Sequence, residues 1–238
     1  KNSGTVIDSA LFEHINKELA KKTKELCYHV VGDPLSVSNL SDYLDISHAY
    51  GHRVNLTTSG FFLEDSHRIA LLHPAIKQIN FSLSSQFANA KKYPFEAYME
   101  RIANVCLHVH RKECFINLRL WNENDIRFAS FNEAVIRFLS NKFHIQIDKT
   151  TKTTRIAPYT LLARDTLFTW PNIHMKPRNK TGSCHALSGQ IAILTDGSVV
   201  PCCLDANGDM SLGNILDNSL QNILYSPRAT AMRQGFSE

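Results

Sequence analysis

Apolar residues along residues 1–169 follow two patterns that alternate along the chain. One has the spacing of a helix face, as in Leu11, Ile15 and Leu19, and the other is the short, dense run of a strand. The helical pattern covers residues 8–23, 36 or 38 to 50, 65–72, 94–111 and 130–142. The strand pattern covers residues 25–31, 53–58, 76–83, 114–121 and 155–162. Strands that alternate with helices in this way predict right-handed βαβ units and a parallel sheet or barrel.

Residues at the segment ends support this α/β interpretation. Asp8 is a typical N-cap for the first helix, Pro94 suits a first helical turn, and Gly51 suits a helix C-terminus. The chain begins with a helix, so the parallel array lacks its first strand as given.

The remainder of the chain has a different character. Residues 170–183 are polar, basic and interrupted by proline and glycine, as in a linker. Strands over 190–194 and 198–200, joined by an Asp-Gly turn at 196–197, predict a β-hairpin, and a helix follows over 219–225. We therefore expect a barrel domain over 1–169, a linker over 170–183 and a small hairpin-and-helix domain over 184–238.

Composition narrows the class of protein. The chain has 238 residues, 43% of them hydrophobic, which suffices for one sizeable core or slightly more. Its net charge of +4 is spread over scattered residues, so we expect no nucleic-acid partner. No apolar run reaches the ~18 residues of a membrane span, so we expect no membrane partner. Six cysteines at irregular spacing favour a reducing, cytoplasmic setting over a disulfide scaffold.

Three of these cysteines flank the predicted hairpin. Cys184 lies at its entrance, and Cys202 and Cys203 lie at its exit. Thiolates brought together in this way are ligands for a soft metal or an iron–sulfur cluster.

Other residues are better explained as structural. Buried, unreactive thiols are expected at three positions, Cys27, Cys106 and Cys114. Phe61 and Phe62 are expected in the core. Residues 205–209 predict a turn and not a calcium loop, because the glycine position and distal glutamate of an EF-hand are missing.

Two strand ends carry residues suited to ligand binding. Gly32-Asp33-Pro34 follows the first strand, and Thr57-Thr58-Ser59-Gly60 ends the second. The carboxyl ends of parallel strands are where α/β proteins place ligands, and a Gly-Pro loop can turn backbone carbonyls outward to accept from an ammonium group.

Four strand segments together resemble the radical SAM superfamily, whose members use S-adenosylmethionine (SAM). Gly32-Asp33-Pro34 is similar to its "GEP" loop, and residues 57–60 are similar to its "TTNG" strand end. Residues 79–84 and 116–121 resemble its fourth and fifth strands. The cysteine spacing around the hairpin and residues 208–226 resemble its SPASM/twitch auxiliary-cluster domain. The resemblance implies a partial (β/α)6 barrel followed by a small twitch-like domain.

The resemblance also implies cofactors and their sites. The cofactors are SAM, a catalytic [4Fe–4S] cluster and an auxiliary iron–sulfur cluster. Cys184 and Cys202 are the implied ligands of the auxiliary cluster, with Cys203 as a structural neighbour. Arg119 is suited to grip a carboxylate by two hydrogen bonds, although an ion pair inside the barrel explains it equally well. The implied SAM-binding residues are Gly32, Asp33, Pro34, Thr58, Ser59, Ser82, Ser84 and Arg119.

The sequence also departs from the family pattern. The Cys-x3-Cys-x2-Cys motif that holds the catalytic cluster in this family is absent, as are the later ligands of the auxiliary cluster. We expect the triad upstream of Lys1, so that this chain contains no catalytic residue and is inactive alone. Asp33 replaces Glu and Ser59 replaces Asn, and both changes keep the polarity.

The implied activity is that of a radical SAM oxidoreductase or modifying enzyme. It would cleave SAM reductively and abstract hydrogen from a peptide, a protein or a small molecule, with flavodoxin or ferredoxin as electron donor. Two alternatives stay open: a degenerate radical SAM fold that serves as a binding or scaffold module, and a structural zinc held by the C-terminal domain.

Overall fold

A computed structural model describes residues 5–30, 32–88, 93–109, 114–167, 169–171, 173–176 and 184–236. The chain divides into two compact units, which we describe separately. The sheet unit comprises Lys24–His29 and Asp33–Phe168, and the hairpin unit comprises Lys1–Thr23, Val30–Gly32 and Thr169–Glu238.

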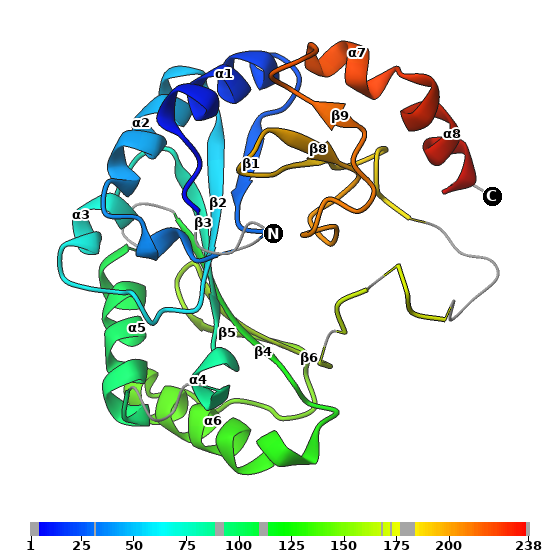
Figure 1. The fold of residues 1–238 in the computed structure, drawn as a ribbon. Coiled ribbons are helices and arrows are strands. Elements are labelled where there is room, and N and C mark those ends of the chain that lie inside the picture. The colour runs from blue at the N-terminus through cyan, green and yellow to red at the C-terminus, as the bar shows by residue number, and fades with distance from the viewer. Residues whose placement is uncertain are drawn as a thin grey trace. The chain divides into compact units, whose positions relative to one another are not determined.

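The sheet unit is built on one six-stranded sheet with the order β1-β2-β3-β4-β6-β5 (Figure 1). Its strands are β1 (Glu25–Tyr28), β2 (Arg53–Thr58), β3 (Ile76–Ser82), β4 (Phe115–Trp121), β5 (Thr153–Ala157) and β6 (Thr160–Asp165). All neighbouring strands pair in parallel except β5 and β6. The predicted parallel sheet is therefore confirmed.

Helices follow most of these strands. They are α2 (Leu40–Ala49), α3 (His67–Leu71), α4 (Ser85–Ala88), α5 (Phe95–Val109) and α6 (Ala129–Phe143), with short 3₁₀ turns η1 (Pro34–Ser36) and η3 (Ile126–Phe128). All five helices predicted within residues 1–169 are present, that of 8–23 being α1 of the hairpin unit, although their ends differ by a few residues. The second helix starts at Leu40 and not at Ser36 or Ser38, because Asp33 and Pro34 begin a separate 3₁₀ turn.

The single strand expected over 155–162 is wrong. Two antiparallel strands, β5 and β6, occupy this region, and Pro158 and Tyr159 turn the chain between them. Tyr159 has a φ of 58°, the left-handed conformation of a tight turn. The apolar run over 155–162 therefore belongs to the two strands of one hairpin, and periodicity alone does not show where the first strand ends and the second begins.

One face of the sheet packs on the helices, and this packing forms the main core (Figure 1). Leu56, Ile79, Phe81 and Leu118 are fully buried there among residues of α2, α5 and α6. Because side chains alternate along a strand, the intervening residues face the other side of the sheet. That second face is polar and carries the candidate site.

The hairpin unit combines the beginning of the chain with its end. Its elements are α1 (Ser9–Leu19), β7 (Ala192–Ile193), β8 (Ser198–Val200), β9 (Gly213–Asn214), α7 (Leu220–Leu224) and α8 (Pro227–Gly235). Asp8 caps α1 as predicted, accepting from the N–H groups of Ala10 and Leu11. The predicted hairpin is confirmed as β7 and β8, and β9 adds an unpredicted third strand.

Helix α1 packs on the C-terminal elements of this unit. Leu11 and Ile15 share an apolar cluster with Val199, Leu220 and Ile223. The Glu18 carboxylate also accepts a hydrogen bond of 3.0 Å from the N–H of Leu220, at the start of α7. This grouping of α1 with residues two hundred positions later was not predicted; the sequence placed residues 1–169 in one domain.

Little of the predicted linker can be compared with the structure. Residues 172 and 177–183 lie outside the described residues, and the described residues of 169–176 form neither helix nor strand. In the parts of the chain that the structure covers, no helix is both long enough and apolar enough to cross a membrane.

Candidate functional site

The candidate site is the face of the sheet that points away from the helices, which we call the polar face. Its residues lie side by side in rows across neighbouring strands. Asn55 pairs with Gln78, Thr57 with Asn80, Asn80 with Asn117, and Ser82 with Arg119. The polar face comprises Glu25, Cys27, Asn55, Thr57, Gln78, Asn80, Ser82, Asn117 and Arg119.

Hydrogen bonds among side chains fix the part of the polar face that Glu25, Asn55, Thr57, Gln78 and Asn80 form. Asn55 Nδ2 donates to Glu25 Oε2 at 3.1 Å, and Gln78 Nε2 donates to Asn80 Oδ1 at 2.7 Å. Asn80 Nδ2 lies 3.3 Å from both Thr57 Oγ1 and the Leu56 carbonyl oxygen. These polar groups satisfy one another's hydrogen bonds, so the side chains in this part of the face are held in fixed positions.

Two polar side-chain atoms that β4 contributes to this face are buried and lack partners. Arg119 Nε and Asn117 Oδ1 have no hydrogen-bond partner in the described residues. The guanidinium of Arg119 lies over the Trp121 ring, 4.7 Å from its centroid, and burial lowers the pKa of Arg119. A partly desolvated cation with a free donor is suited to an anionic ligand such as a carboxylate.

A second part of the site joins the two strand-end segments identified in the sequence. The Asp33 carboxylate accepts hydrogen bonds from Thr58 Oγ1 at 2.7 Å, Ser59 N at 2.7 Å and Ser59 Oγ at 2.6 Å. It also accepts from Leu35 N at 3.0 Å, which caps η1. Asp33 thus ties the loop after β1 to the end of β2, so that the two segments form one rigid edge.

The other predicted residues lie close to this edge in the fold. Ser82 ends β3 beside Arg119 of β4, and Ser84 follows in the turn before α4. Ser85, which the sequence analysis did not single out, has its Oγ 2.5 Å from the Ser82 carbonyl oxygen and 3.5 Å from that of Ser59. Gly32 has a φ of 100°, a conformation that favours glycine, before Pro34 begins η1.

Cys27 is not buried as expected but lies exposed on the polar face. The signal for this was present in the sequence, because Glu25 and His29 flank Cys27 at the two-residue spacing of one strand face. Cys106 and Cys114 are buried as predicted, and burial raises the pKa of each thiol to about 12. Phe61 packs against the core as predicted. The prediction that Phe62 lies in the core is wrong, since Phe62 is 49% exposed.

The environment of Cys27 predicts slow alkylation. Partial desolvation raises the pKa of its thiol, and only the thiolate reacts. At pH 8, Cys27 is expected to react with iodoacetamide more slowly than a free cysteine, with its rate rising at higher pH than that of the free thiol. Peptide mapping by mass spectrometry measures this. Cys106 is the control, since it should stay unlabelled in the native protein, and reaction of Cys27 at the free-cysteine rate would contradict the prediction.

The hairpin unit holds the predicted cluster ligands. Cys184 is exposed, and its Sγ accepts a hydrogen bond of 3.4 Å from the N–H of Ala186. The N–H of Leu187 lies 3.3 Å from the carbonyl oxygen of Pro201, which brings the segment after Cys184 next to the residue before Cys202. Hydrogen bonds from backbone N–H groups to sulfur also occur at iron–sulfur sites, where they tune the reduction potential of the cluster.

The neighbours of these cysteines are structural. Cys203 packs against the small apolar cluster of Ala192, Leu194 and Val200. The Asp205 carboxylate accepts from the N–H groups of Asp209 and Met210, at 2.9 and 2.8 Å, and so forms the predicted turn. Within the described ranges no group of three or more His, Cys, Asp or Glu side chains is arranged to hold a metal ion. Among these residues Cys184 and Cys202 therefore do not form a complete metal site.

Comparison with known families identifies the C-terminal part. Residues 184–238 match SPASM, an iron–sulfur cluster-binding domain. No curated protein matches the sequence of the chain.

Solved structures match the chain over nearly its whole length. "Crystal structure of BtrN in complex with AdoMet and 2-DOIA" shares 17% identity with a TM-score of 0.56, covering 98% of this chain and 75% of that one. "Native anSMEcpe with bound AdoMet" shares 12% identity with a TM-score of 0.62, covering 97% and 75%. SuiB of Streptococcus suis bound to S-adenosylmethionine shares 12% identity with a TM-score of 0.61, covering 98% and 62%.

These comparisons show the fold of the chain. BtrN, anSMEcpe and SuiB were each solved with AdoMet bound, and at 12–17% identity the likeness is one of fold, in agreement with the α/β fold predicted from the sequence. Residues 184–238 separately match the SPASM iron–sulfur domain, as the cysteine spacing predicted.

Proposed function

We propose that the protein is a radical SAM enzyme that binds SAM beside Arg119, where the polar face reaches the carboxyl ends of the strands, and cleaves it reductively. The observation that carries the proposal is the half-buried guanidinium of Arg119, whose Nε has no partner in the described residues. It lies on the carboxyl side of a parallel sheet, the side where such folds bind ligands. SAM carries the carboxylate that this cation lacks.

The remaining residues are assigned complementary tasks. Backbone carbonyls of the loop Gly32-Asp33-Pro34 accept from the SAM ammonium group. The Asp33 side chain is occupied by Thr58, Ser59 and Leu35, so its own task is to hold the loop against β2. The hydroxyl groups of Ser82 and Ser84 line the cofactor between this loop and Arg119.

The clusters complete the proposed chemistry. The electron for cleavage of SAM to methionine and 5′-deoxyadenosine comes from a reduced [4Fe–4S] cluster, whose cysteine triad is not among these 238 residues. Cys184 and Cys202 supply two thiolates to the auxiliary cluster. The protein itself binds and orients SAM and excludes water, while the redox chemistry belongs to the cofactors.

Two substrate classes are consistent with the fold. Among the matching structures, anSMEcpe was solved with the Kp18Cys peptide and SuiB with its precursor peptide SuiA, whereas BtrN was solved with 2-DOIA. We propose a peptide or small-molecule substrate that reaches the polar face, with flavodoxin or ferredoxin as electron donor.

The test is release of 5′-deoxyadenosine from SAM. The full-length protein, reconstituted anaerobically with iron and sulfide and reduced with dithionite, should release it, and residues 1–238 alone should not. If a full-length protein shown to carry iron releases no 5′-deoxyadenosine, the binding-module alternative is favoured. Absence of visible iron–sulfur absorption after reconstitution would favour structural zinc, which is colourless.

Arg119→Gln is expected to weaken SAM binding by about 10- to 100-fold, because a charge-assisted hydrogen bond of about 1.5–3 kcal/mol is lost. The measurement is the KM for SAM in the cleavage assay. Arg155→Gln removes an exposed arginine from β5 and should leave the KM unchanged. Equal KM values for the Arg119 variant and the wild type would show that SAM does not use this guanidinium.

A further inference from the structure

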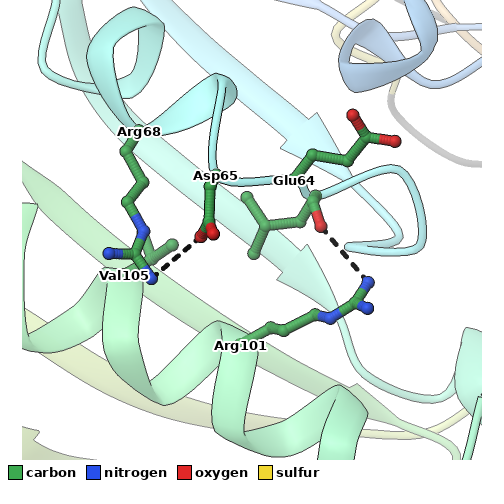
Figure 2. A pocket seen from close by; sticks show the side chains of 6 residues that line it. Glu64, Asp65, Arg68, Arg101 and Val105 are labelled. Atoms are coloured by element: carbon green, nitrogen blue, oxygen red, sulfur yellow. Dashed lines mark hydrogen bonds and ion pairs between the residues drawn. The ribbon is translucent and has the colours of Figure 1, made fainter.

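The segment that follows β2, residues 59–63, is held by helix α5 at both of its ends. Tyr98 Oη donates a hydrogen bond of 2.6 Å to the carbonyl oxygen of Ser59. One turn further along α5, Arg101 donates to the carbonyl oxygen of Leu63 at 3.4 Å (Figure 2). Two α5 side chains thus fix two backbone carbonyls of the same short segment.

Aromatic packing tightens the same contact. The Phe61 ring stacks on Tyr98, with centroids 5.2 Å apart, and on Tyr93 at 6.0 Å. Arg101 lies over the Tyr93 ring, 4.7 Å from its centroid. Gly60 has a φ of 80°, and a Cβ at this position would lie only 3.1 Å from Ile102 Cδ1, so the backbone approaches α5 closely.

The hydroxyl group of Tyr98 is a neutral, buried donor. The side chain is 1% exposed, and burial together with the nearby negative charge of Asp33 raises its pKa above the usual value. Its hydrogen bond therefore persists over the whole physiological pH range. The carbonyl that it satisfies belongs to Ser59, the residue whose N–H and Oγ bind Asp33.

These contacts form a continuous path from α5 to the loop after β1. Tyr98 holds Ser59 from the helix side, and Asp33 holds Ser59 from the loop side. The pocket in Figure 2, of about 230 Å³, lies at the other end of the segment 59–63, where Leu63, Arg101 and Val105 are among the residues that line it. Tyr98 and Asp33 thus hold Ser59 from two sides, with Ser85 Oγ 3.5 Å from the same carbonyl oxygen as Tyr98, and Tyr98 lies outside every motif identified in the sequence.

We infer that Tyr98 is a positioning residue for SAM, acting through the Ser59 carbonyl to set the edge formed by Ser59 and Asp33. The inference rests on the proposed function, since it assigns SAM to that edge. Tyr98 does not contact the cofactor; it fixes the segment that does. Its loss should therefore change SAM affinity more than turnover at saturating SAM.

The test compares Tyr98→Phe with a matched control, Tyr28→Phe. Tyr28 Oη also donates to a backbone carbonyl, that of Tyr43 in α2, at 2.9 Å, and its ring is likewise packed against the core. Each variant removes one hydroxyl group and keeps the ring, so both should lower the melting temperature by similar amounts. A merely structural role for Tyr98 would leave the two variants alike in every assay.

SAM binding separates the two variants. The reconstituted full-length Tyr98→Phe protein is expected to show a KM for SAM raised about 10-fold, with kcat changed less than about 2-fold. A tenfold loss of affinity corresponds to about 1.4 kcal/mol, the contribution of one hydrogen bond. Tyr28→Phe should keep the wild-type KM. Equal KM values for the two variants, or a loss confined to kcat, would overturn the inference.

Hydrogen exchange provides a readout that needs no activity. Tyr98→Phe should speed amide exchange over residues 59–63 by about 10-fold, while Tyr28→Phe should not. If the wild type binds SAM and neither readout changes, the inference alone fails. If the wild type does not bind SAM, the proposed function fails and the inference with it.

A second variant, Arg101→Met, tests the inference if Tyr98→Phe folds poorly. Arg101→Met removes the bond to Leu63 and the contact of the guanidinium with the Tyr93 ring, both from the exposed side of α5. It should raise the KM for SAM about 3-fold and speed exchange at the same segment. An unchanged KM with faster exchange would count against the inference, since the segment would then move without consequence for SAM.

Discussion

Asp33→Ala is expected to weaken SAM binding by about 100-fold and to lower the free energy of unfolding by about 2–3 kcal/mol. The Asp33 carboxylate accepts hydrogen bonds from Leu35, Thr58 and Ser59, and no other described side chain replaces it at these donors. Removing one partner of a part-buried, charge-assisted network leaves its donors unsatisfied. The loop after β1 would then separate from the end of β2, and the carbonyls assigned to the SAM ammonium group would lose their position.

The measurements are the KM for SAM of the full-length protein and urea unfolding. Asp125→Ala is the matched control, because Asp125 likewise caps a 3₁₀ turn, accepting from Arg127 N at 3.0 Å. That variant should lose only a little stability and no SAM affinity. If Asp33→Ala and Asp125→Ala behave alike, Asp33 is a simple cap and the junction of the two segments has no role in binding.

Cys202→Ala is expected to remove the auxiliary cluster completely. Cys202 is buried at the exit of the β7–β8 hairpin, and alanine provides no sulfur ligand. The full-length variant should lose the auxiliary share of its iron and acid-labile sulfide and the matching visible absorbance. Because a bound cluster stabilises the fold that holds it, the reconstituted variant should also unfold at lower temperature than the reconstituted wild type.

Cys203→Ala is the control for this experiment. Its side chain packs in the cluster of Ala192, Leu194 and Val200, so the variant should keep the full iron content and lose only packing. Retention of iron by Cys202→Ala together with its loss in Cys203→Ala would mean that the neighbouring thiol is the ligand. The pair of adjacent cysteines thus gives a variant and control that differ by one position.

The residues of the proposed SAM site are held in place in two different ways. The proposed SAM site needs Asp33, Ser59 and Arg119 in fixed positions, and side-chain hydrogen bonds hold the first two. Arg119 is held instead by packing on Trp121. Mutations at Tyr98 and Arg119 should consequently combine additively in free energy, because the contacts they remove share no partner.

Much of the fold follows from the order of residues along the chain. The strand segments 53–58 and 76–83 and the helix after Pro94 have periodic apolar positions and clear boundary residues, and each was found where expected. The Asp196-Gly197 turn fixed the hairpin for the same reason, since Gly197 adopts a φ of 85° there. The cysteine spacing around that hairpin identified the class of the C-terminal domain, in agreement with the SPASM match.

Residues whose importance depends on distant partners could not be found in this way. Tyr98 is one apolar position among many on its helix until the fold brings its hydroxyl group to Ser59, 39 positions earlier. Cys27 was expected to be buried because its run is largely apolar, although the two-residue alternation already indicated the polar face.

The sequence by itself determined the types and order of the elements, the hairpin and the strand-end motifs, because local spacing decides which residues can form a helix face, a strand or a turn. Tertiary structure decided that α1 packs on the C-terminal elements, that residues 153–165 fold as two strands, and that Asp33 joins two segments 25 positions apart. Each of these depends on which surfaces meet in space. A pattern of burial shows that a residue has a partner, and only the folded chain shows which one.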